Sequence, residues 1–93
     1  ENELKVPHTG WNQLNIKMNS ALFSGIPDQS YVYFNHSFYC QPKDQQDTIG
    51  TTDYGLSFTA AIQRRTLFGV QFHPEKSQKV GLSILKNFVE VRL

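Results

Sequence analysis

The chain has 93 residues and a net charge of +1, and 39% of its residues are hydrophobic, 13% aromatic and 18% charged. This length suits one small domain at most, and the aromatic content favours a packed sheet over disorder. The near-neutral charge gives no reason to expect nucleic acid, and no stretch approaches the roughly 18 apolar residues of a membrane span, so we expect a cytoplasmic protein.

The N-terminal part of the chain is predicted to form two short strands around a loop. Residues 4–6 alternate between apolar and polar, as a strand does. Residues 7–12 are predicted to form a loop in which Gly10 is free to take a positive φ. Trp11, the only tryptophan, is there either a plug for the core or an anchor for a partner. Residues 14–18 alternate again, which predicts a second strand pairing back on the first.

The next part of the chain is predicted to contain a helical turn and a central strand. Residues 20–26 indicate one helical turn, closed by Gly25 and Pro27, and residues 28–29 begin a turn. Residues 30–39 are rich in aromatic side chains and are the best candidate for a central strand. A strand that is apolar on both faces needs cover on both.

The histidines and the cysteine do not predict a metal site or a nucleophile. His8, His36 and His73 lie far apart in the sequence, without the short spacing or the cysteine partner typical of metal ligands. We therefore interpret His36 as a core or strand-end histidine. Cys40 precedes Gln41 without a Gly-rich turn or a helix start to activate a thiolate, so we interpret it as a structural cysteine.

A run of short strands with tight reversals is predicted next. Residues 41–47 form a polar connection, and residues 48–54 form a short strand or turn that Gly55 ends. Residues 56–62 alternate between apolar and mostly small or polar side chains, which indicates a half-buried strand. Residues 64–65 are predicted to bend the chain back, and connections this short imply antiparallel neighbours.

One stretch near the C-terminal end presents a histidine and a glutamate together. Residues 67–72 form an apolar run that predicts a strand, and Pro74 is expected to end it with His73 at its carboxyl end. If the chain stays extended through Pro74, His73 and Glu75 leave the same face about 6 to 7 Å apart at Cα. A carboxylate that orients an imidazole makes up two members of a nucleophilic triad. The alternative is an exposed pair that merely flanks a proline turn.

A helix is predicted to follow this pair directly. Ser77 is a suitable N-cap, and the apolar residues after it recur at three- and four-residue spacing: Val80, Ile84, Leu85, Phe88 and Val89. The helix is therefore expected to anchor the histidine–glutamate pair.

Three segments of the chain resemble class I (triad-type) glutamine amidotransferases. Residues 69–77, Gly-Val-Gln-Phe-His-Pro-Glu-Lys-Ser, resemble the histidine–glutamate box of that family. Residues 6–12, Val-Pro-His-Thr-Gly-Trp-Asn, and residues 33–38, Tyr-Phe-Asn-His-Ser-Phe, resemble segments of its branch of glutaminase subunits of imidazole glycerol phosphate synthase. All three occur in the family's order, and the resemblance covers about the C-terminal half of the family's chain.

The resemblance implies an α/β fold of which residues 1–93 are a single partial domain. This piece is the strand-rich C-terminal half of the amidotransferase fold, with a mixed or antiparallel sheet and a C-terminal helix. The implied reaction is glutamine hydrolysis, in which a cysteine thiolate attacks the side-chain amide, His73 transfers protons and Glu75 orients His73. No metal and no organic cofactor is expected.

The resemblance also implies partners. Ammonia would pass to a cyclase subunit that makes imidazole glycerol phosphate in histidine biosynthesis, in a heterodimer. Trp11 and Asn12 would face that subunit, with Lys76 near the same surface. The nucleophilic cysteine and the oxyanion segment of the family are not among these residues. We therefore expect the missing N-terminal half of the domain to be a second partner, and this chain alone not to hydrolyse glutamine.

Two other functions remain open from the sequence. The chain is alternatively a non-catalytic interaction fragment that binds a partner or another copy through Trp11 and an unpaired sheet edge. It is also compatible with an amidotransferase that feeds ammonia to a different sugar-modifying acceptor.

Overall fold

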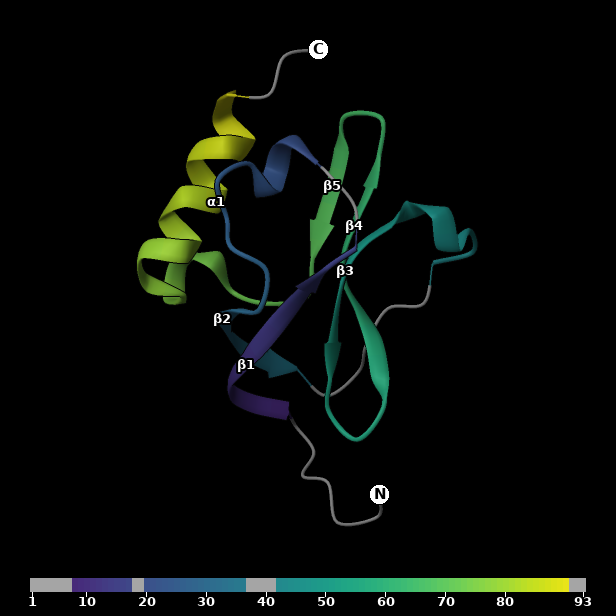
Figure 1. Ribbon diagram of the computed structural model, residues 1–93, viewed down its shortest axis with the longest axis vertical. Helices are drawn as coiled ribbons and strands as arrows, with labels where there is room; N and C mark the ends of the chain where they lie inside the picture. The colour runs from purple at the N-terminus through teal and green to yellow at the C-terminus, as the bar shows by residue number, and fades with distance from the viewer. Residues whose placement is uncertain (1–7, 18–19, 37–41, 91–93) are drawn as a thin grey trace.

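Five antiparallel strands in the order β2-β1-β3-β4-β5 form the frame of the described part of the chain (Figure 1). This computed structural model describes residues 8–17, 20–36 and 42–90. The strands are β1 (His8–Ile16), β2 (Ser30–His36), β3 (Thr48–Asp53), β4 (Ser57–Arg64) and β5 (Leu67–Val70). The helix α1 (Gln78–Glu90) closes the described residues, and the short 3-10 turns are η1 (Ala21–Phe23), η2 (Gln45–Asp47) and η3 (Pro74–Lys76). The predicted strand-rich piece with a C-terminal helix is confirmed.

Strand β1 replaces the loop and the separate strand that the sequence predicts over residues 7–18. Residues 8–12 are extended and not a loop, and residues 14–16 continue the same strand without pairing back on an earlier one. The register runs from His8 opposite His36 to Leu14 opposite Ser30, so a long ladder replaces the predicted loop. Gly10 takes the expected positive φ, 125°, within this strand. The strand predicted over residues 4–6, and Met18, lie outside the described residues.

Strand β2 lies at the edge of the sheet, whereas the sequence predicts a central strand. Val32 and Phe34 are fully buried on one face, but Tyr31 is 56% exposed on the other. The aromatic residues of this strand led to the prediction of a central position, but tyrosine can keep its ring partly in contact with water. The strand therefore does not need to be covered on both faces. Residues 37–39 of the predicted strand, and Cys40, lie outside the described residues.

The hairpins β3–β4 and β4–β5 confirm the predicted meander. Gly55 has a φ of 79° at the first reversal, and Arg65 has a φ of 57° at the second. Both strand pairs are antiparallel. Strand β5 ends at Val70, two residues earlier than the predicted strand, because the chain bends at residues 71 and 72.

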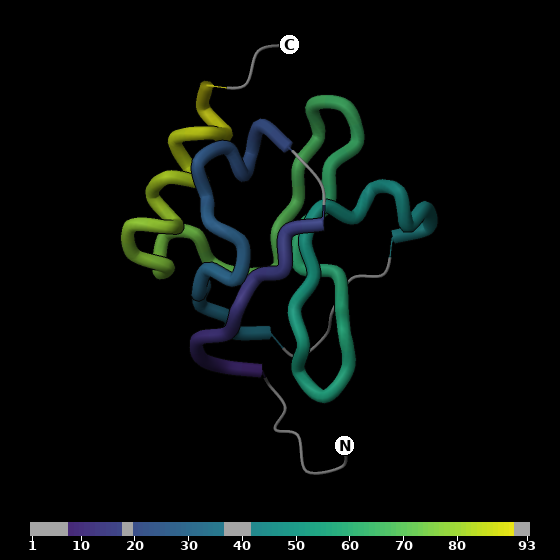
Figure 2. The backbone as a smooth tube through the Cα atoms, viewed as in Figure 1, coloured from purple at the N-terminus to yellow at the C-terminus, as the bar shows by residue number. Residues whose placement is uncertain are grey.

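Helix α1 packs on the sheet and on η1, as the tube in Figure 2 shows from the same side. Ile84 is buried in the core, and Asn87 Nδ2 donates to the carbonyls of Leu22 and Ser24 at 2.9 and 2.8 Å. The predicted apolar face is covered only in part, because three of its side chains, Leu85, Phe88 and Val89, are exposed. Leu82, outside that face, is exposed as well. In the described part of the chain, no helix is long and apolar enough to cross a membrane.

Candidate active site

The structure brings His73 and Glu75 into direct contact. His73 Nδ1 lies 2.9 Å from Glu75 Oε2, and the side chains are 37% and 60% exposed. When Nδ1 is bonded to the carboxylate, Nε2 is the nitrogen that remains free for a reacting group. The pair therefore has the geometry of a base and its orienting acid, on an open surface.

The turn that carries this pair differs from the predicted extended segment. Pro74, Glu75 and Lys76 form the 3-10 turn η3, for which His73 is the N-cap residue in an extended conformation. Proline fits the first position of a helical turn because its missing N–H has no partner there and its φ is already suitable. The two side chains therefore meet across the start of a turn and not along one face of a strand.

Glu75 is held in its ionised form. The hydrogen bond from His73 lowers the pKa of the Glu75 carboxyl most, and a hydrogen bond from its own backbone N–H lowers it further. Desolvation opposes this shift, and the charges of His73 and Lys76 add to it. A carboxylate only accepts hydrogen bonds, so His73 Nδ1 must be the donor. In the neutral form of the imidazole, this assignment leaves a lone pair on Nε2 for proton transfer.

Trp11 and Lys76 meet through a residue that was not predicted to take part. The indole of Trp11 contacts the ring of Tyr33 edge-on, with centroids 5.7 Å apart and an angle of 74° between the rings. Lys76 Nζ lies 5.9 Å from the centre of the same tyrosine ring, which is within the range of a cation–π contact. Trp11 is 47% exposed. These three side chains, called the aromatic cluster below, adjoin His73, whose ring centroid is 6.5 Å from that of Tyr33.

Asn12 faces away from the aromatic cluster. Neighbouring side chains of a strand point to opposite faces, and the Asn12 amide donates to the carbonyl of Asp53 at 2.8 Å. Its nitrogen also lies 3.5 Å from His8 Nε2. The described contacts of Asn12 thus tie β1 to the end of β3.

His8 and His36 form a second pair of titratable groups. His8 Nδ1 lies 3.0 Å from His36 Nε2, and the His8 ring stacks on Tyr54 with centroids 3.8 Å apart. Burial, and secondarily the neighbouring His36, lower the pKa of His8. No group of three or more metal-ligating side chains occurs within residues 8–17, 20–36 and 42–90.

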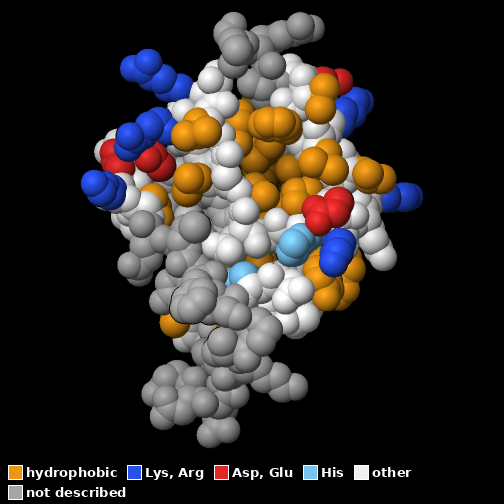
Figure 3. All heavy atoms as spheres, turned by 180° about the vertical axis from the view of Figure 1, so that it is seen from behind, with side chains coloured by type: hydrophobic (Ala, Val, Ile, Leu, Met, Phe, Trp, Pro, Cys, Tyr) orange, Lys and Arg blue, Asp and Glu red, His pale blue; other side chains and the backbone are white. Residues whose placement is uncertain are grey.

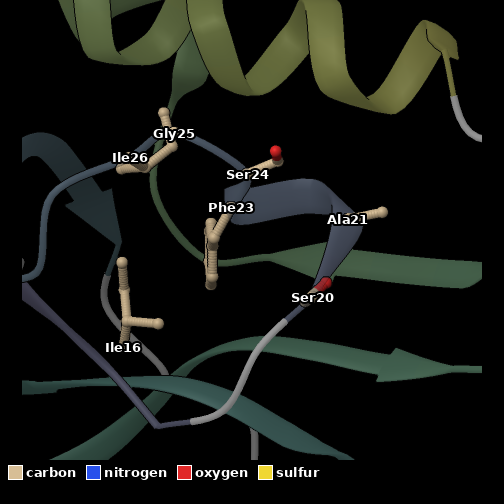
Figure 4. Close-up of a pocket in the computed structure, with 7 residues that line it drawn as sticks. All are labelled: Ile16, Ser20, Ala21, Phe23, Ser24, Gly25 and Ile26. Atoms are coloured by element: carbon tan, nitrogen blue, oxygen red, sulfur yellow. The ribbon is translucent and has the colours of Figure 1, made fainter.

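A hollow wider than the surroundings of the His73–Glu75 pair lies elsewhere, between the end of β1 and η1 (Figure 4). It has a volume of about 530 Å³ and is lined by Ile16, Ser20, Ala21, Phe23, Ser24, Gly25 and Ile26. The described residues of this lining offer two hydroxyls and no titratable side chain, so they lack the groups that acid–base or nucleophilic chemistry needs. We therefore place the candidate site at His73 and Glu75.

An apolar groove runs between β5 and α1, close to the histidine–glutamate pair. It has a volume of about 160 Å³ and is lined by Leu22, Phe68, Gly69, Val70, Pro74, Ile84, Leu85 and Phe88. Figure 3 shows hydrophobic side chains gathered along this face, with a histidine, an acidic and a basic side chain at its lower margin. Pro74 joins the groove to the turn that carries the pair.

Tyr33 and Ser77 are the two residues of this region that the sequence did not single out for such roles. Tyr33 lies opposite Trp11 in the β1–β2 register. Ser77 is predicted as the cap of α1, but its hydroxyl bonds the main chain of His73 and Tyr33. Tyr33 could be identified only from the pairing of β1 with β2. The sequence did not predict this pairing, because residues 7–12 were expected to form a loop.

Comparison with known proteins gives the family. The model of the family described as glutamine amidotransferase class-I matches residues 2–91. Relatives described as "Imidazole glycerol phosphate synthase subunit HisH" come from Moorella thermoacetica, 54% identical over 88 residues, and from Methanosarcina barkeri, 50% identical over 93 residues. The first match covers 95% of this chain and 42% of the relative, and the second covers 98% and 46%. The chain therefore spans less than half the length of these curated relatives.

Proposed function

The chain belongs to the class-I glutamine amidotransferase family, and we propose that it supplies the histidine and glutamate of a glutaminase site. The observation that carries this proposal is the contact of 2.9 Å between His73 Nδ1 and Glu75 Oε2, with Glu75 held as a carboxylate. A neutral imidazole oriented in this way can take a proton from a thiol through Nε2.

The proposed reaction uses His73 twice. A cysteine thiolate attacks the side-chain amide carbon of glutamine, and the imidazolium of His73 gives its proton to the departing nitrogen, which leaves as ammonia. The glutamyl thioester that remains is attacked by water, whose proton returns to His73, and glutamate and the thiol are released. Glu75 fixes the tautomer of His73 and stabilises its charged form between these steps. No step of this scheme needs a metal or an organic cofactor.

The cysteine is proposed to come from a part of an amidotransferase chain outside residues 1–93, since the match covers only 42% of the Moorella relative. The His73–Glu75 pair is open to solvent in this chain, whereas proton transfer of this kind is favoured where water is excluded. We propose that the rest of the domain covers the apolar groove between β5 and α1. Leu85 and Phe88 are 39% and 52% exposed there, and β5 is the last strand of the described sheet, with an edge free to pair.

A chimera tests the glutaminase proposal. In the Moorella relative, residues 1–93 of this chain would replace the matched segment, and glutamate release from glutamine would be measured. We expect activity that falls at least about 100-fold in His73→Ala, the range of general acid–base catalysis. Glu75→Gln should also lose activity, and Glu90→Gln, at the far end of α1, should not. A chimera that binds glutamine but is indifferent to His73→Ala would overturn the proposal.

The chain alone is proposed to be inactive, because its scheme requires a thiolate from outside these residues. Ammonia release from the purified 93-residue chain that disappears in His73→Ala would contradict this.

The docking of the other part of the domain is tested by adding the unmatched segment of the Moorella relative to this chain in trans. Phe88→Ser, which alters the groove, should weaken the association, whereas Val89→Ser, which is 79% exposed and outside the groove lining, should not.

The partner for ammonia is proposed to be a cyclase subunit, in a heterodimer that serves histidine biosynthesis in the cytoplasm. The description of the relatives as a subunit of imidazole glycerol phosphate synthase supports this choice. The aromatic cluster supports the site of docking, because an exposed tryptophan beside a half-buried tyrosine and a cation is typical of interface anchors. Asn12, whose side chain faces away from the cluster, is proposed to contribute by tying β1, the strand that carries Trp11, to the end of β3.

Binding of the cyclase subunit of the Moorella synthase to the chimera tests this partner. Trp11→Ala should weaken binding by 10-fold or more, as expected for an aromatic anchor that the partner covers. Leu67→Ala should not, because Leu67 is 67% exposed at the far hairpin. Binding that depends on Trp11 in a chimera without His73-dependent glutaminase activity would instead support a non-catalytic interaction module. Glutaminase activity without any binding to this cyclase would favour a different acceptor of ammonia.

A further inference from the structure

We infer that Ser77 is a positioning residue that holds the main chain of His73 against strand β2. The hydrogen bonds of Ser77 do not depend on the function of the chain. Only the expected effect on catalysis rests on the proposed role of His73. Ser77 is 1% exposed, and its hydroxyl makes two hydrogen bonds. It donates to the carbonyl of His73 at 2.6 Å and accepts from the backbone N–H of Tyr33 at 2.9 Å.

A third hydrogen bond completes the connection between the turn and the strand. The backbone N–H of His73 donates to the carbonyl of Tyr33 at 2.8 Å. Both main-chain groups of Tyr33 are therefore used by the segment from His73 to Ser77, and both main-chain groups of His73 are held as well. Such a closed set of bonds leaves the Cα of His73 little freedom to move relative to β2.

The two restraints on His73 act on different parts of the residue. Glu75 bonds the ring and sets its rotation, and Ser77 and Tyr33 bond the backbone and set where the ring starts from. A displacement of a catalytic group by about 1 Å can cost about 100-fold in rate. A residue that fixes the backbone thus affects chemistry without touching substrate.

Serine suits this position because one small hydroxyl both donates and accepts. Alanine would leave the Tyr33 N–H without its partner at a part-buried contact, where an unpaired donor is costly. Threonine keeps the hydroxyl and is the conservative variant. Ser83, an exposed serine on α1, provides the matched control.

The first experiment measures the His73–Glu75 contact in the folded 93-residue chain. The hydrogen bond from His73 is the main cause of the lowered pKa of Glu75, so this carboxyl reports how well His73 is placed. Carboxyl-detected NMR titration should show the pKa of Glu75 moving up toward its ordinary value in Ser77→Ala. It should stay low in Ser77→Thr and in Ser83→Ala. A general loss of stability would not move this pKa while the chain remains folded.

The second experiment measures turnover in the chimera described above. Ser77→Ala should lower kcat by about 10-fold or more with little change in KM for glutamine, and Ser77→Thr should restore most of it. If Ser77→Ala fails to fold, the comparison of Ser77→Thr with Ser77→Cys, whose thiol is a weaker donor, carries the test, and the cysteine variant should show the larger effects.

The outcomes separate this inference from the proposed function. An unchanged pKa of Glu75 in a folded Ser77→Ala chain would overturn the positioning role, whatever the activity of the chimera. Where the alanine variant does not fold, the same result in Ser77→Cys would overturn it. The Glu75 titration could shift in the Ser77→Ala chain while the chimera shows no glutaminase activity even with the native residues. This result would sustain the positioning role of Ser77 and reject the glutaminase proposal.

Discussion

Gly81, in the first turns of α1, lies directly against the carbonyl group of Pro74 in the turn that carries the histidine–glutamate pair. A Cβ at Gly81 would overlap the Pro74 carbonyl oxygen deeply and would lie 2.9 Å from Ser77 Cβ. Backbone atoms cannot move aside as the end of a side chain can. The helix can approach the turn this closely only because residue 81 has no side chain.

Gly81→Ala is therefore expected to destabilise the chain although alanine is the better helix former. Helix propensity favours alanine by about 1 kcal/mol, but forcing extra volume into a packed contact costs about 1–3 kcal/mol, and here a backbone group is in the way. We expect a net loss of at least about 1 kcal/mol in urea unfolding. Ser83→Ala, at an exposed position of the same helix, should be neutral or slightly stabilising. An equally stable Gly81→Ala protein would mean that η3 and α1 are not packed this closely.

Thr52→Val is expected to leave stability unchanged or to raise it by about 1 kcal/mol. Thr52 is fully buried in β3, and its Oγ1 has no hydrogen-bond partner within the described residues. Valine has the same shape and removes an unpaired hydroxyl, whose burial is costly.

The neighbouring Thr48 gives the matched control for this change. It is 6% exposed, and its Oγ1 lies 3.2 Å from Thr59 Oγ1. Thr48→Val removes one partner of this bond and should cost about 0.5–1.5 kcal/mol in thermal or urea unfolding. Equal losses in both variants would mean that Thr52 has a partner after all.

Stability is expected to fall between about pH 7 and pH 5 because of His8. Burial and the neighbouring His36 lower the pKa of His8 in the folded chain below its ordinary value of about 6.5. In that window the unfolded chain binds more protons at this site, so the free energy of unfolding decreases as the pH falls through 6.5 toward the lower folded pKa. Urea unfolding at pH 7.5 and pH 5.5 measures this difference.

His8→Phe should make the pH dependence of stability shallower, because it keeps an aromatic ring against Phe34 and Tyr54 and removes the titrating group. The control is His73→Phe at the more exposed histidine, which should retain the part of the slope due to His8. A slope that is the same in the native protein and in His8→Phe would show that another group causes it.

Removal of His73 is expected to raise the pKa of Glu75. The bond from His73 is the first cause of the lowered pKa of this carboxyl, so in His73→Ala the carboxyl should titrate at higher pH. The hydrogen bond between His73 and the Glu75 carboxylate is therefore fully formed above the ordinary pKa of an exposed glutamate. It is lost as the pH falls through the lowered pKa of Glu75. NMR titration of the Glu75 carboxyl measures both. Lys79→Ala, which removes an exposed positive charge nearby on α1, should leave the pKa of Glu75 unchanged. A shift of equal size in Lys79→Ala would mean that nearby charge in general, and not the contact with His73, lowers this pKa.

The sequence by itself determined the strand-rich architecture, the hairpins at Gly55 and Arg65, the closing helix and the adjacency of His73 and Glu75. These features depend on local rules, such as alternation, turn residues, helical spacing and a separation of two residues along the chain.

Only the tertiary structure decided which strands pair and what surrounds the site. The pairing of β1 with β2 turned a predicted loop into a strand, placed Trp11 beside Tyr33 and brought His8 to His36. The fold also directed the hydroxyl of Ser77 to Tyr33 and His73. Such contacts join residues far apart in the chain, and their energy comes from cross-strand packing and hydrogen bonding, which no local pattern of residues records.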